Sequence, residues 1–243
     1  MKRILFLLIF ILSISALNTK IFSQTADEII DRYAEAMGGA DKLLSVNSLK
    51  FSGTVSARGN DLDYTLTAER NGKARTEINY QGMQMVNACD GNTGWTVNPF
   101  SGTRDADMLP PEEVKTLRKK SEFEGELINY REKGYKAEFL EKDDFEGSEV
   151  YKIKLTDNDG DVTYYFIDLD TYLLLMSKSK RKIGEKEITS ETIYGNYKMT
   201  GGIMFPMSLD IKTSDDRGGL KINCETVEIN AKVDDSIFKM PGK

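Results

Sequence analysis

The sequence contains no histidine. This absence excludes Ser-His-Asp and Cys-His catalysis, zinc or iron sites built on imidazole, and a histidine-based pH switch. No run of one charge dominates the sequence either, because 33 Lys and Arg residues are interspersed with 39 Asp and Glu residues, and the net charge is -6. Nucleic-acid binding depends on clustered Lys and Arg, so we expect no nucleic-acid partner.

Long hydrophobic runs are absent except at the amino end. Lys2 and Arg3 precede a largely apolar run over residues 4–17, and polar residues follow up to Lys20. This order is typical of a secretory signal peptide, and the run is short for a stop-transfer helix. We therefore predict a signal peptide over residues 1–24, with a retained membrane anchor as the alternative. No Cys stands at the boundary, so we expect no lipid attachment there.

A helix is expected directly after the signal peptide. Thr25 and Glu28 have the spacing of a capping box, and Gly38 and Gly39 are suited to end the helix. The apolar residues between them recur at helical spacing and form one stripe: Ile29, Ile30, Tyr33 and Met37. A short second helix is expected at about residues 40–46.

From Leu49 onward the pattern changes to strands rich in Val, Ile, Thr, Tyr and Phe, separated by turn residues. The segments are 49–57, 62–70, 74–80, 83–89, 94–98, 136–142, 149–156, 162–168, 172–182, 187–198, 204–213 and 220–230. Short turns such as Asn71-Gly72 and Asp159-Gly160 favour antiparallel neighbours. A sheet of about 11 to 12 strands normally curls or closes, so we predict a mostly β (α+β) barrel or half-barrel.

One interruption, residues 99–134, lacks strand alternation. Within it, Pro110 and Pro111 precede Glu112 and Glu113, and a basic end follows at residues 118–120, which predicts an inserted helix. Both helical pieces are expected to bury their apolar sides against the concave side of the sheet. There is no Gly/Ser-rich or Pro-rich linker, so residues 25–243 are predicted to form a single domain.

Several segments, taken in order, resemble the LolA-like periplasmic proteins, the outer-membrane lipoprotein-sorting family. They are Ala26–Gly39, Ser48–Thr54, Cys89–Trp95, Asn98–Phe100, Tyr164–Leu173, Tyr194–Tyr197, Phe205–Pro206 and Val227–Phe238. The resemblance implies an unclosed antiparallel barrel with a helical lid. It also implies a periplasmic carrier that shields the acyl chains of lipoproteins or lipids in a hydrophobic cavity during transfer toward the outer membrane.

The same resemblance implies partners, namely release machinery in the inner membrane and an acceptor in the outer membrane. From the residue patterns we expect neither catalysis nor a cofactor, and an enzyme that works without histidine is a further alternative. In such carriers an arginine of the barrel latches the lid, and Arg58, Arg70 and Arg75 are the candidates here. Proteins of this fold also serve other functions. The alternative is therefore an envelope sensor or adaptor that binds a protein partner on the same concave face.

The candidate ligand-binding residues are apolar. Within the predicted lid they are Ile30, Tyr33 and Met37. Methionine suits a surface that must adapt to flexible chains, which adds Met83, Met85 and Met108. Trp95 follows a turn and is expected near the mouth of the cavity, and Phe205 completes the set. For each of these residues, ordinary core packing is the alternative.

Other chemical patterns are weaker. The acidic turn at residues 157–161 resembles a calcium loop, but the positions of its first and last ligands would be Leu155 and Phe166, so we expect a hairpin turn and no metal site. The basic run over residues 178–182 is interpreted as charge that protects an exposed sheet edge. Cys89 and Cys224 could form a disulfide in an oxidising compartment, while a buried free thiol is the default expectation.

Overall fold

The computed structural model describes residues 24–57, 59–102, 104–183, 186–214 and 219–242. The predicted signal peptide, except for Gln24, and the latch candidate Arg58 lie outside the described residues. No helix in the described ranges is long and apolar enough to cross a membrane.

Two helices open the described chain, as the sequence predicts. Helix α2 (Ala26–Ala36) begins with the full capping box between Thr25 and Glu28, and α3 (Ala40–Leu44) follows after one turn. Gly38, between them, has φ of 111°, and a Cβ atom there would lie 2.3 Å from the carbonyl oxygen of Gly202. A glycine is therefore required both by the backbone conformation and by the close approach of another segment.

The strands form one large antiparallel sheet. They are β1 (Ser48–Ala57), β2 (Asn60–Glu69), β3 (Lys73–Tyr80), β4 (Met83–Asp90), β5 (Gly94–Val97), β6 (Asp107–Met108), β7 (Lys136–Phe145), β8 (Ser148–Thr156), β9 (Val162–Asp168), β10 (Leu174–Ile183), β11 (Lys186–Gly195), β14 (Ser208–Thr213) and β15 (Leu220–Ile229). Their order in space is β6-β5-β4-β3-β2-β1-β15-β14-β11-β10-β9-β8-β7. The carboxyl-terminal strand β15 therefore joins the two halves of the sheet by pairing with β1 and β14.

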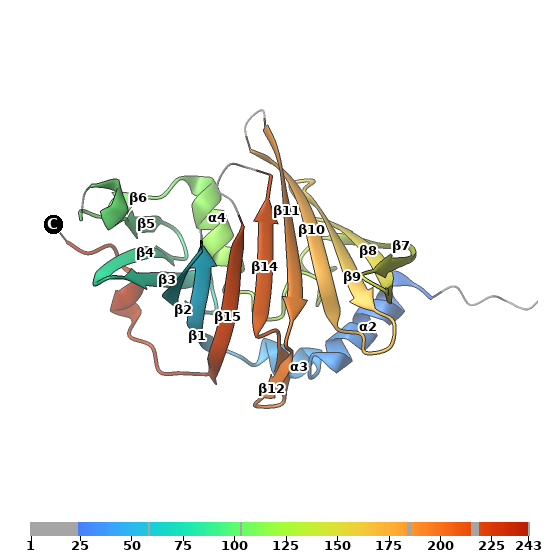
Figure 1. The fold of residues 1–243 in the computed structure, drawn as a ribbon. Coiled ribbons are helices and arrows are strands. Elements are labelled where there is room, and N and C mark those ends of the chain that lie inside the picture. Colours follow the sequence, from blue (N-terminus) through green and yellow to red (C-terminus); the bar gives the residue numbers. More distant parts are fainter. Residues whose placement is uncertain (1–23, 58, 103, 184–185, 215–218, 243) are drawn as a thin grey trace, which may run out of the picture.

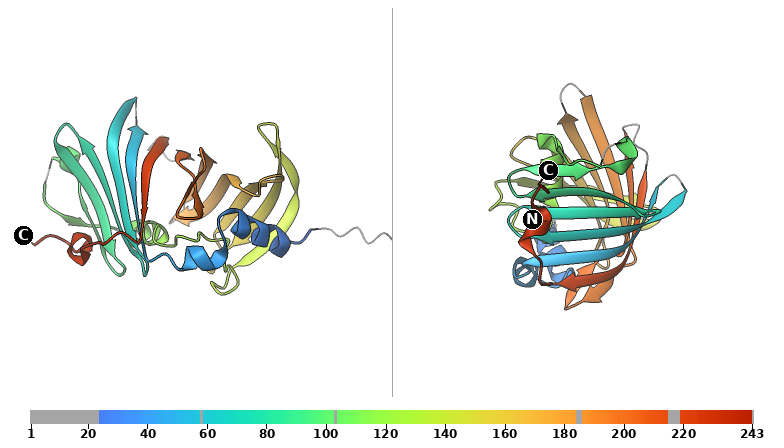
Figure 2. Two further views of the ribbon diagram at one scale, coloured as in Figure 1. Left: turned by 90° about the horizontal axis from the view of Figure 1, so that it is seen from below. Right: turned by 90° about the vertical axis from the view of Figure 1, so that its left-hand side faces the viewer.

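The sheet curves into an open trough (Figures 1 and 2). Its terminal strands, β6 and β7, do not pair with each other in the described chain. The predicted mostly β half-barrel is confirmed, with 13 strands in the sheet where the sequence indicates about 11 to 12. The strand predicted over residues 204–213 is divided into two strands at Pro206, which has no N–H group to donate to a neighbouring strand. Its first part belongs to β13 (Ile203–Phe205), which pairs with β12 (Lys198–Thr200), and its second part is β14 of the large sheet.

Helices line the open side of this trough. Helices α2 and α3 run along it, and the inserted helix α4 (Pro111–Lys119), predicted from its proline start and basic end, lies against β3, β4 and β5 (Figure 2). The main core surrounds α2 and includes Ile29, Leu43 and Ile167, each at most 2% exposed. A smaller cluster beneath α4 contains Val114, Leu117 and small side chains of β2 to β4.

The structure settles two expectations, one about the basic run of β10 and one about the two cysteines. Strand β10 lies between β9 and β11, so the basic run that begins at Lys178 does not protect a sheet edge; that interpretation was wrong. Cys89 and Cys224 are both free thiols, in agreement with the default expectation. Cys89 is buried and donates to the carbonyl oxygen of Gly72 at 3.0 Å.

Candidate functional site

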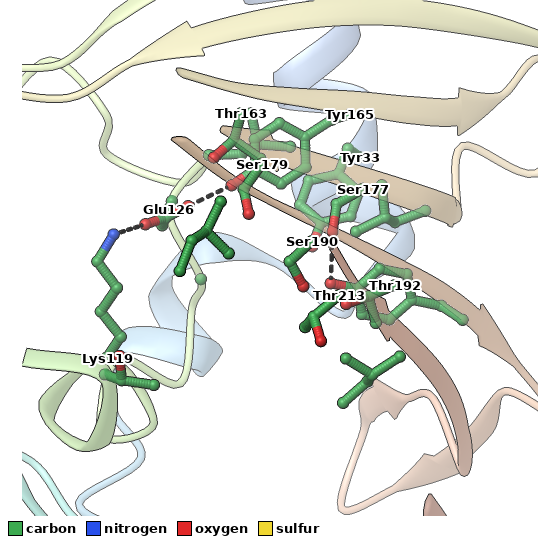
Figure 3. A pocket seen from close by; sticks show the side chains of 17 residues that line it. Tyr33, Lys119, Glu126, Thr163, Tyr165, Ser177, Ser179, Ser190, Thr192 and Thr213 are labelled. Atoms are coloured by element: carbon green, nitrogen blue, oxygen red, sulfur yellow. Dashed lines mark hydrogen bonds and ion pairs between the residues drawn. The ribbon is translucent and has the colours of Figure 1, made fainter. Parts of the chain in front are cut away.

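A cavity of about 510 Å³, here called the chamber, occupies the concave face of the second half of the sheet (Figure 3). Ten of its 17 lining residues carry a hydroxyl group. Its lining residues are Tyr33, Thr116, Lys119, Gly125, Glu126, Leu127, Thr163, Tyr165, Leu174, Ser177, Ser179, Ile188, Ser190, Thr192, Tyr194, Ile211 and Thr213. The chamber is therefore large enough for an organic ligand, but much of its wall offers hydrogen bonds.

The hydroxyl wall follows from strand alternation. In β10, Ser177 and Ser179 face the chamber, so Lys178 lies on the opposite, convex face. There Lys178 pairs with Glu191 of β11, whose own neighbours Ser190 and Thr192 face the chamber. The alternation thus separates charge on the outside from neutral hydroxyls on the inside.

One ion pair and several tyrosines enter the chamber. Glu126 pairs with Lys119 and also accepts a hydrogen bond of 2.6 Å from the hydroxyl of Tyr165. Burial, together with the neighbouring charge of Glu126, raises the pKa of Tyr165 well above its ordinary value, so this phenol remains a neutral donor. On the other side, the hydroxyls of Ser177 and Tyr194 lie 3.0 Å apart.

A second cavity of about 160 Å³, here called the pocket, adjoins the chamber at Ile211, which lines both. Its wall is mainly apolar: Phe51, Ser52, Tyr64, Leu66, Lys120, Pro206, Met207, Leu209, Ile211, Ile222 and Cys224. These residues come from β1, β2, β14 and β15, from the segment before β14 and from the end of α4. The concave face therefore combines a hydroxyl-lined chamber with an apolar pocket.

Helix α4 is tied to the second half of the sheet by charge. Lys115 pairs with Asp159 and lies 3.7 Å from Asp161, and Lys119 lies 3.9 Å from Asp157. These carboxylates belong to the β8–β9 turn, the acidic sequence that resembles a calcium loop. Among the residues described, no group of three or more potential ligand side chains is placed to hold a metal ion.

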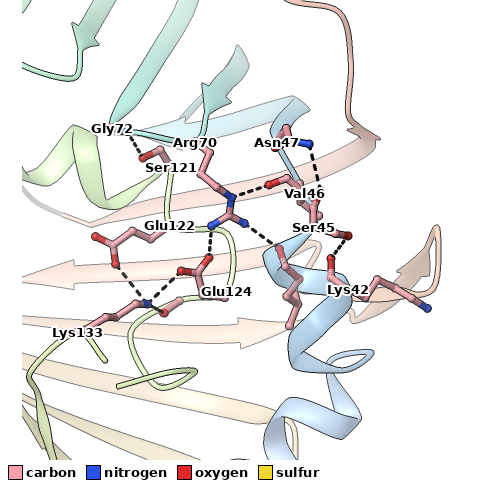
Figure 4. A network of polar contacts seen from close by, with 12 residues as sticks. Lys42, Ser45, Val46, Asn47, Arg70, Gly72, Ser121, Glu122, Glu124 and Lys133 are labelled. Atoms are coloured by element: carbon pink, nitrogen blue, oxygen red, sulfur yellow. Dashed lines mark hydrogen bonds and ion pairs between the residues drawn. The ribbon is translucent and has the colours of Figure 1, made fainter. Parts of the chain in front are cut away.

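Arg70, directly after β2, connects the sheet to both helical segments (Figure 4). Its guanidinium donates to the carbonyl oxygens of Leu43 at 2.9 Å and Val46 at 2.7 Å, near the end of α3. It also forms an ion pair of 2.8 Å with Glu124 in the inserted segment. Burial alone raises the pKa of Glu124, but the Arg70 hydrogen bond and the charge of Lys133 together bring it below the ordinary value.

The other latch candidate described by the structure serves a different part of the chain. Arg75 donates to the carbonyl oxygen of Ile237 at 2.9 Å and to Glu77 at 2.8 Å, and its guanidinium lies over the ring of Trp95. These contacts hold the carboxyl-terminal segment, not a helical cover. Of the two, Arg70 alone contacts α3 and the inserted segment.

The predicted residues of the first helix occupy three different environments. Tyr33 lines the chamber. Ile30 is 4% exposed and packs in the main core. Met37 caps the end of α2, where its carbonyl oxygen accepts a hydrogen bond of 3.0 Å from the amide of Met204.

The remaining predicted residues are divided between the two faces of the sheet. Met83 and Met85 share the concave face of β4 with the pocket residue Tyr64, as the pairing register through β3 requires. Trp95 follows Gly94, which faces α4, so the indole lies on the convex side and donates to the carbonyl oxygen of Phe238 at 2.9 Å. It borders a separate hollow of about 370 Å³.

Met108 pairs with Trp95 in the sheet and is 59% exposed. Phe205 is 5% exposed and packs edge-on against the pocket residue Phe51, with ring centroids 5.7 Å apart. Phe205 thus supports the pocket wall from behind, while its neighbour Pro206 lines the pocket directly.

Sequence reasoning missed the residues that give the cavities their polarity. They are the chamber hydroxyls of β10, β11 and β14, the Glu126–Lys119 pair and the pocket residue Lys120. A signal for the hydroxyls was available, because Ser177-Lys178-Ser179-Lys180 alternates two kinds of polar residue with the period of a strand. No comparable pattern marks Lys120.

No protein-family model matches the sequence, and no curated protein matches it. Solved structures do match in fold. A LolA superfamily protein from Nitrosomonas europaea aligns at a TM-score of 0.56 with 12% identity, covering 89% of this chain and 98% of that one. A putative outer membrane lipoprotein-sorting protein domain from Vibrio parahaemolyticus aligns at 0.57 with 11% identity, covering 88% and 97%.

A DUF1329 family protein from Desulfovibrio piger aligns at a TM-score of 0.58 with 11% identity, covering 88% of this chain and 97% of that one. At these identities the matches establish the fold alone. The chain has the fold of the LolA-like proteins, and the resemblance predicted from its sequence is confirmed at that level.

Proposed function

We propose that this chain, which has the LolA-like fold, is a periplasmic, non-enzymatic protein that binds lipids or acylated proteins and shields their alkyl chains during transfer toward the outer membrane. The observation that carries the proposal is the apolar pocket that adjoins a larger chamber on the concave face. Proteins of similar fold include a putative lipoprotein-sorting domain, which supports the same class of ligand.

The physical need for such a site is simple. Burial of each CH₂ group is worth about 0.8 kcal/mol, so an alkyl chain crosses an aqueous compartment only with its apolar surface covered. The side chains of Phe51, Leu66 and Ile222 in the pocket provide a covering surface. Transfer also requires release machinery in the inner membrane and an acceptor in the outer membrane, which we keep as proposed partners.

Release of the ligand requires that a cover can open. Arg70 holds the end of α3 and the inserted segment to the sheet, so we assign it the role of the latch. Its bonds to two carbonyl oxygens and one carboxylate are all broken if the covers separate from the β2–β3 hairpin. The predicted signal peptide at residues 1–24 supports delivery to the periplasm.

The alternative is an envelope sensor or adaptor that binds a protein partner on the concave face. One observation favours it: the larger cavity is lined by hydroxyls such as Ser179, Ser190 and Thr192, which suit a polar segment better than an alkyl chain. A peptide in the chamber would exchange hydrogen bonds with these groups.

The test is to express the chain with its own signal segment, purify it from a bacterial periplasm, and analyse it by native mass spectrometry and lipid extraction. We expect bound lipid or an acylated protein. Ile222→Asn, in the pocket wall, should reduce the bound lipid, whereas Ile193→Asn on the convex side of β11 is the matched control and should not. A protein that carries no lipid and takes up no fluorescent fatty acid would contradict the proposal.

A further inference from the structure

The pocket holds one charged side chain among apolar neighbours. Lys120 caps the carboxyl end of α4 and lines the pocket. None of the other lining residues is charged. Its ammonium has no hydrogen bond or ion pair within the part of the chain that the structure describes. An anionic ligand in the pocket would gain a charge-assisted hydrogen bond from this cation.

The neighbouring residue provides the contrast. Lys119 faces the chamber, where Glu126 neutralises it. Lys120 faces the pocket, where no carboxylate is present. Two consecutive lysines at the end of one helix therefore enter the two cavities, and only the one in the apolar cavity lacks a negative partner. Among the described residues, no carboxylate balances the charge of Lys120 in the pocket.

Lys120 is an exposed residue that borders the open space of the pocket. Desolvation by the surrounding protein nevertheless lowers the pKa of its ammonium. A carboxylate beside it would favour the charged form again, so ligand binding and protonation of Lys120 would support each other.

A second donor lines the same pocket. The hydroxyl of Tyr64 has no hydrogen-bond partner among the described residues, and burial raises the pKa of this phenol, so it keeps its proton. The thiol of Cys224, also in the pocket wall, is already bonded to the carbonyl oxygen of Thr226 at 3.2 Å. Lys120 and Tyr64 therefore provide a cationic and a neutral donor in the pocket, and the hydroxyl of Ser52 also lines it. A carboxylate has two oxygen atoms to accept from Lys120 and Tyr64.

We propose that the pocket binds the carboxylate of a single-chain fatty acid, with Lys120 as its ionic partner and Tyr64 as the second donor, and with the alkyl chain against Phe51, Leu66 and Ile222. The proposal rests on the lipid-binding function above and names its ligand. A carboxylate carries one negative charge, which one lysine balances. A phosphate monoester carries about 1.5 to 2 charges and is typically held by arginine clusters, and no arginine lines the pocket.

The test compares two probes of equal chain length, dodecanoate and dodecanol, by calorimetry at neutral pH with delipidated protein. We expect wild type to bind dodecanoate about tenfold to a hundredfold more tightly than dodecanol, the range for a charge-assisted hydrogen bond. Lys120→Met should remove this preference and leave dodecanol binding intact. Lys120→Arg should keep most of the preference, and Tyr64→Phe should reduce it in part.

The matched control is Lys50→Met, which removes the same charge from the convex side of β1, next to the pocket residue Phe51. It should change neither affinity. Equal affinity of wild type for the acid and the alcohol, or an unchanged preference in Lys120→Met, would overturn the carboxylate proposal while lipid binding stands. Failure of wild type to bind either probe would overturn the lipid-binding function as well. Retained affinity of Lys120→Met for dodecanol shows that the variant is folded.

Discussion

Helices α2 and α4 both lie on the concave side of the sheet, but they are attached to it by different forces. Helix α2 buries Ile29, Ile30 and Tyr33 in the main core, where each is at most 8% exposed. Helix α4 buries Val114 and Leu117 against a small cluster and is tied to the β8–β9 turn by ion pairs of its lysines. Apolar burial is the stronger and less salt-dependent attachment, so α2 is the fixed cover and α4 the weaker one.

The largest expected effect tests the fixed cover. Ile29 is fully buried, so Ile29→Ala should lower the free energy of unfolding by about 3 to 4 kcal/mol through lost burial and the cavity it leaves. Leu117→Ala, in the smaller cluster under α4, should cost about 2 kcal/mol because that site can relax more easily. Urea unfolding measures both. Equal losses of unfolding free energy in the two variants would contradict the conclusion that α2 is attached more strongly than α4.

The second effect concerns the latch. Arg70→Ala leaves Glu124, whose side chain is 6% exposed, without its main partner, and we expect a loss of about 2 to 3 kcal/mol. Hydrogen exchange should increase in α3 and in the inserted segment. Arg75→Ala is the control: it should loosen the carboxyl-terminal segment near Ile237 and leave α3 protected. Equal exchange in α3 for the two variants would contradict the assignment of the latch.

The third effect is a dependence on pH. The pKa of Glu124 is below its ordinary value of 4.5 in the folded protein, so its contribution to stability is complete above that value and is lost as the pH falls through the lowered pKa. Glu124→Gln should therefore be less stable than wild type at neutral pH, by about 1 to 2 kcal/mol, and equal to it in strong acid. Thermal unfolding of both proteins across this range checks the sign; a difference that persists in acid would exclude the charge as its cause.

The smallest expected effect is on the rate of ligand entry, and it distinguishes the ion pairs of α4 from its apolar packing. Raising the salt concentration from about 0.1 M to about 1 M shortens the screening length from about 10 Å to about 3 Å, which weakens the pairs with the β8–β9 turn. Ligand entry should become faster by less than about fivefold, since exposed pairs contribute at most about 1 kcal/mol each. Stopped-flow uptake of a fluorescent fatty acid measures the rate. Asp159→Asn should reduce the salt dependence; an unchanged dependence would show that these pairs do not control entry.

Local chemistry explains which parts of the fold could be predicted. The Thr25 capping box, the end of α2 at Gly38 and the proline start of α4 each depend on residues a few positions apart, and all three are found in the structure. The β10 interpretation failed because pairing with β9 and β11 depends on segments distant in sequence. The same reason explains Trp95, whose face of the sheet is set by register and not by its own turn.

The candidate site was harder to predict than the fold. Hydrophobicity directed attention to methionines, whereas the larger cavity is lined by serine and threonine hydroxyls that look like ordinary surface residues in the sequence. Of the predicted ligand residues, Tyr33 is the one that lines the chamber, because it combines a place in the helix stripe with a position opposite β10 and β11. All eight residues, Tyr33 included, stay predictions as ligand contacts.

By itself, the sequence determined that this chain forms helices at its amino end and in one insertion, and that the rest alternates as antiparallel strands. It did so because capping, turn chemistry and strand periodicity act over a few residues. Only the tertiary structure decided that Arg70 joins the end of α3 to the inserted segment, and that, among the described residues, Lys119 pairs with a carboxylate while Lys120 does not. The role of each of these charged side chains depends on which residues, distant in the sequence, the fold places beside it. The residues that neighbour it in the sequence do not reveal those partners.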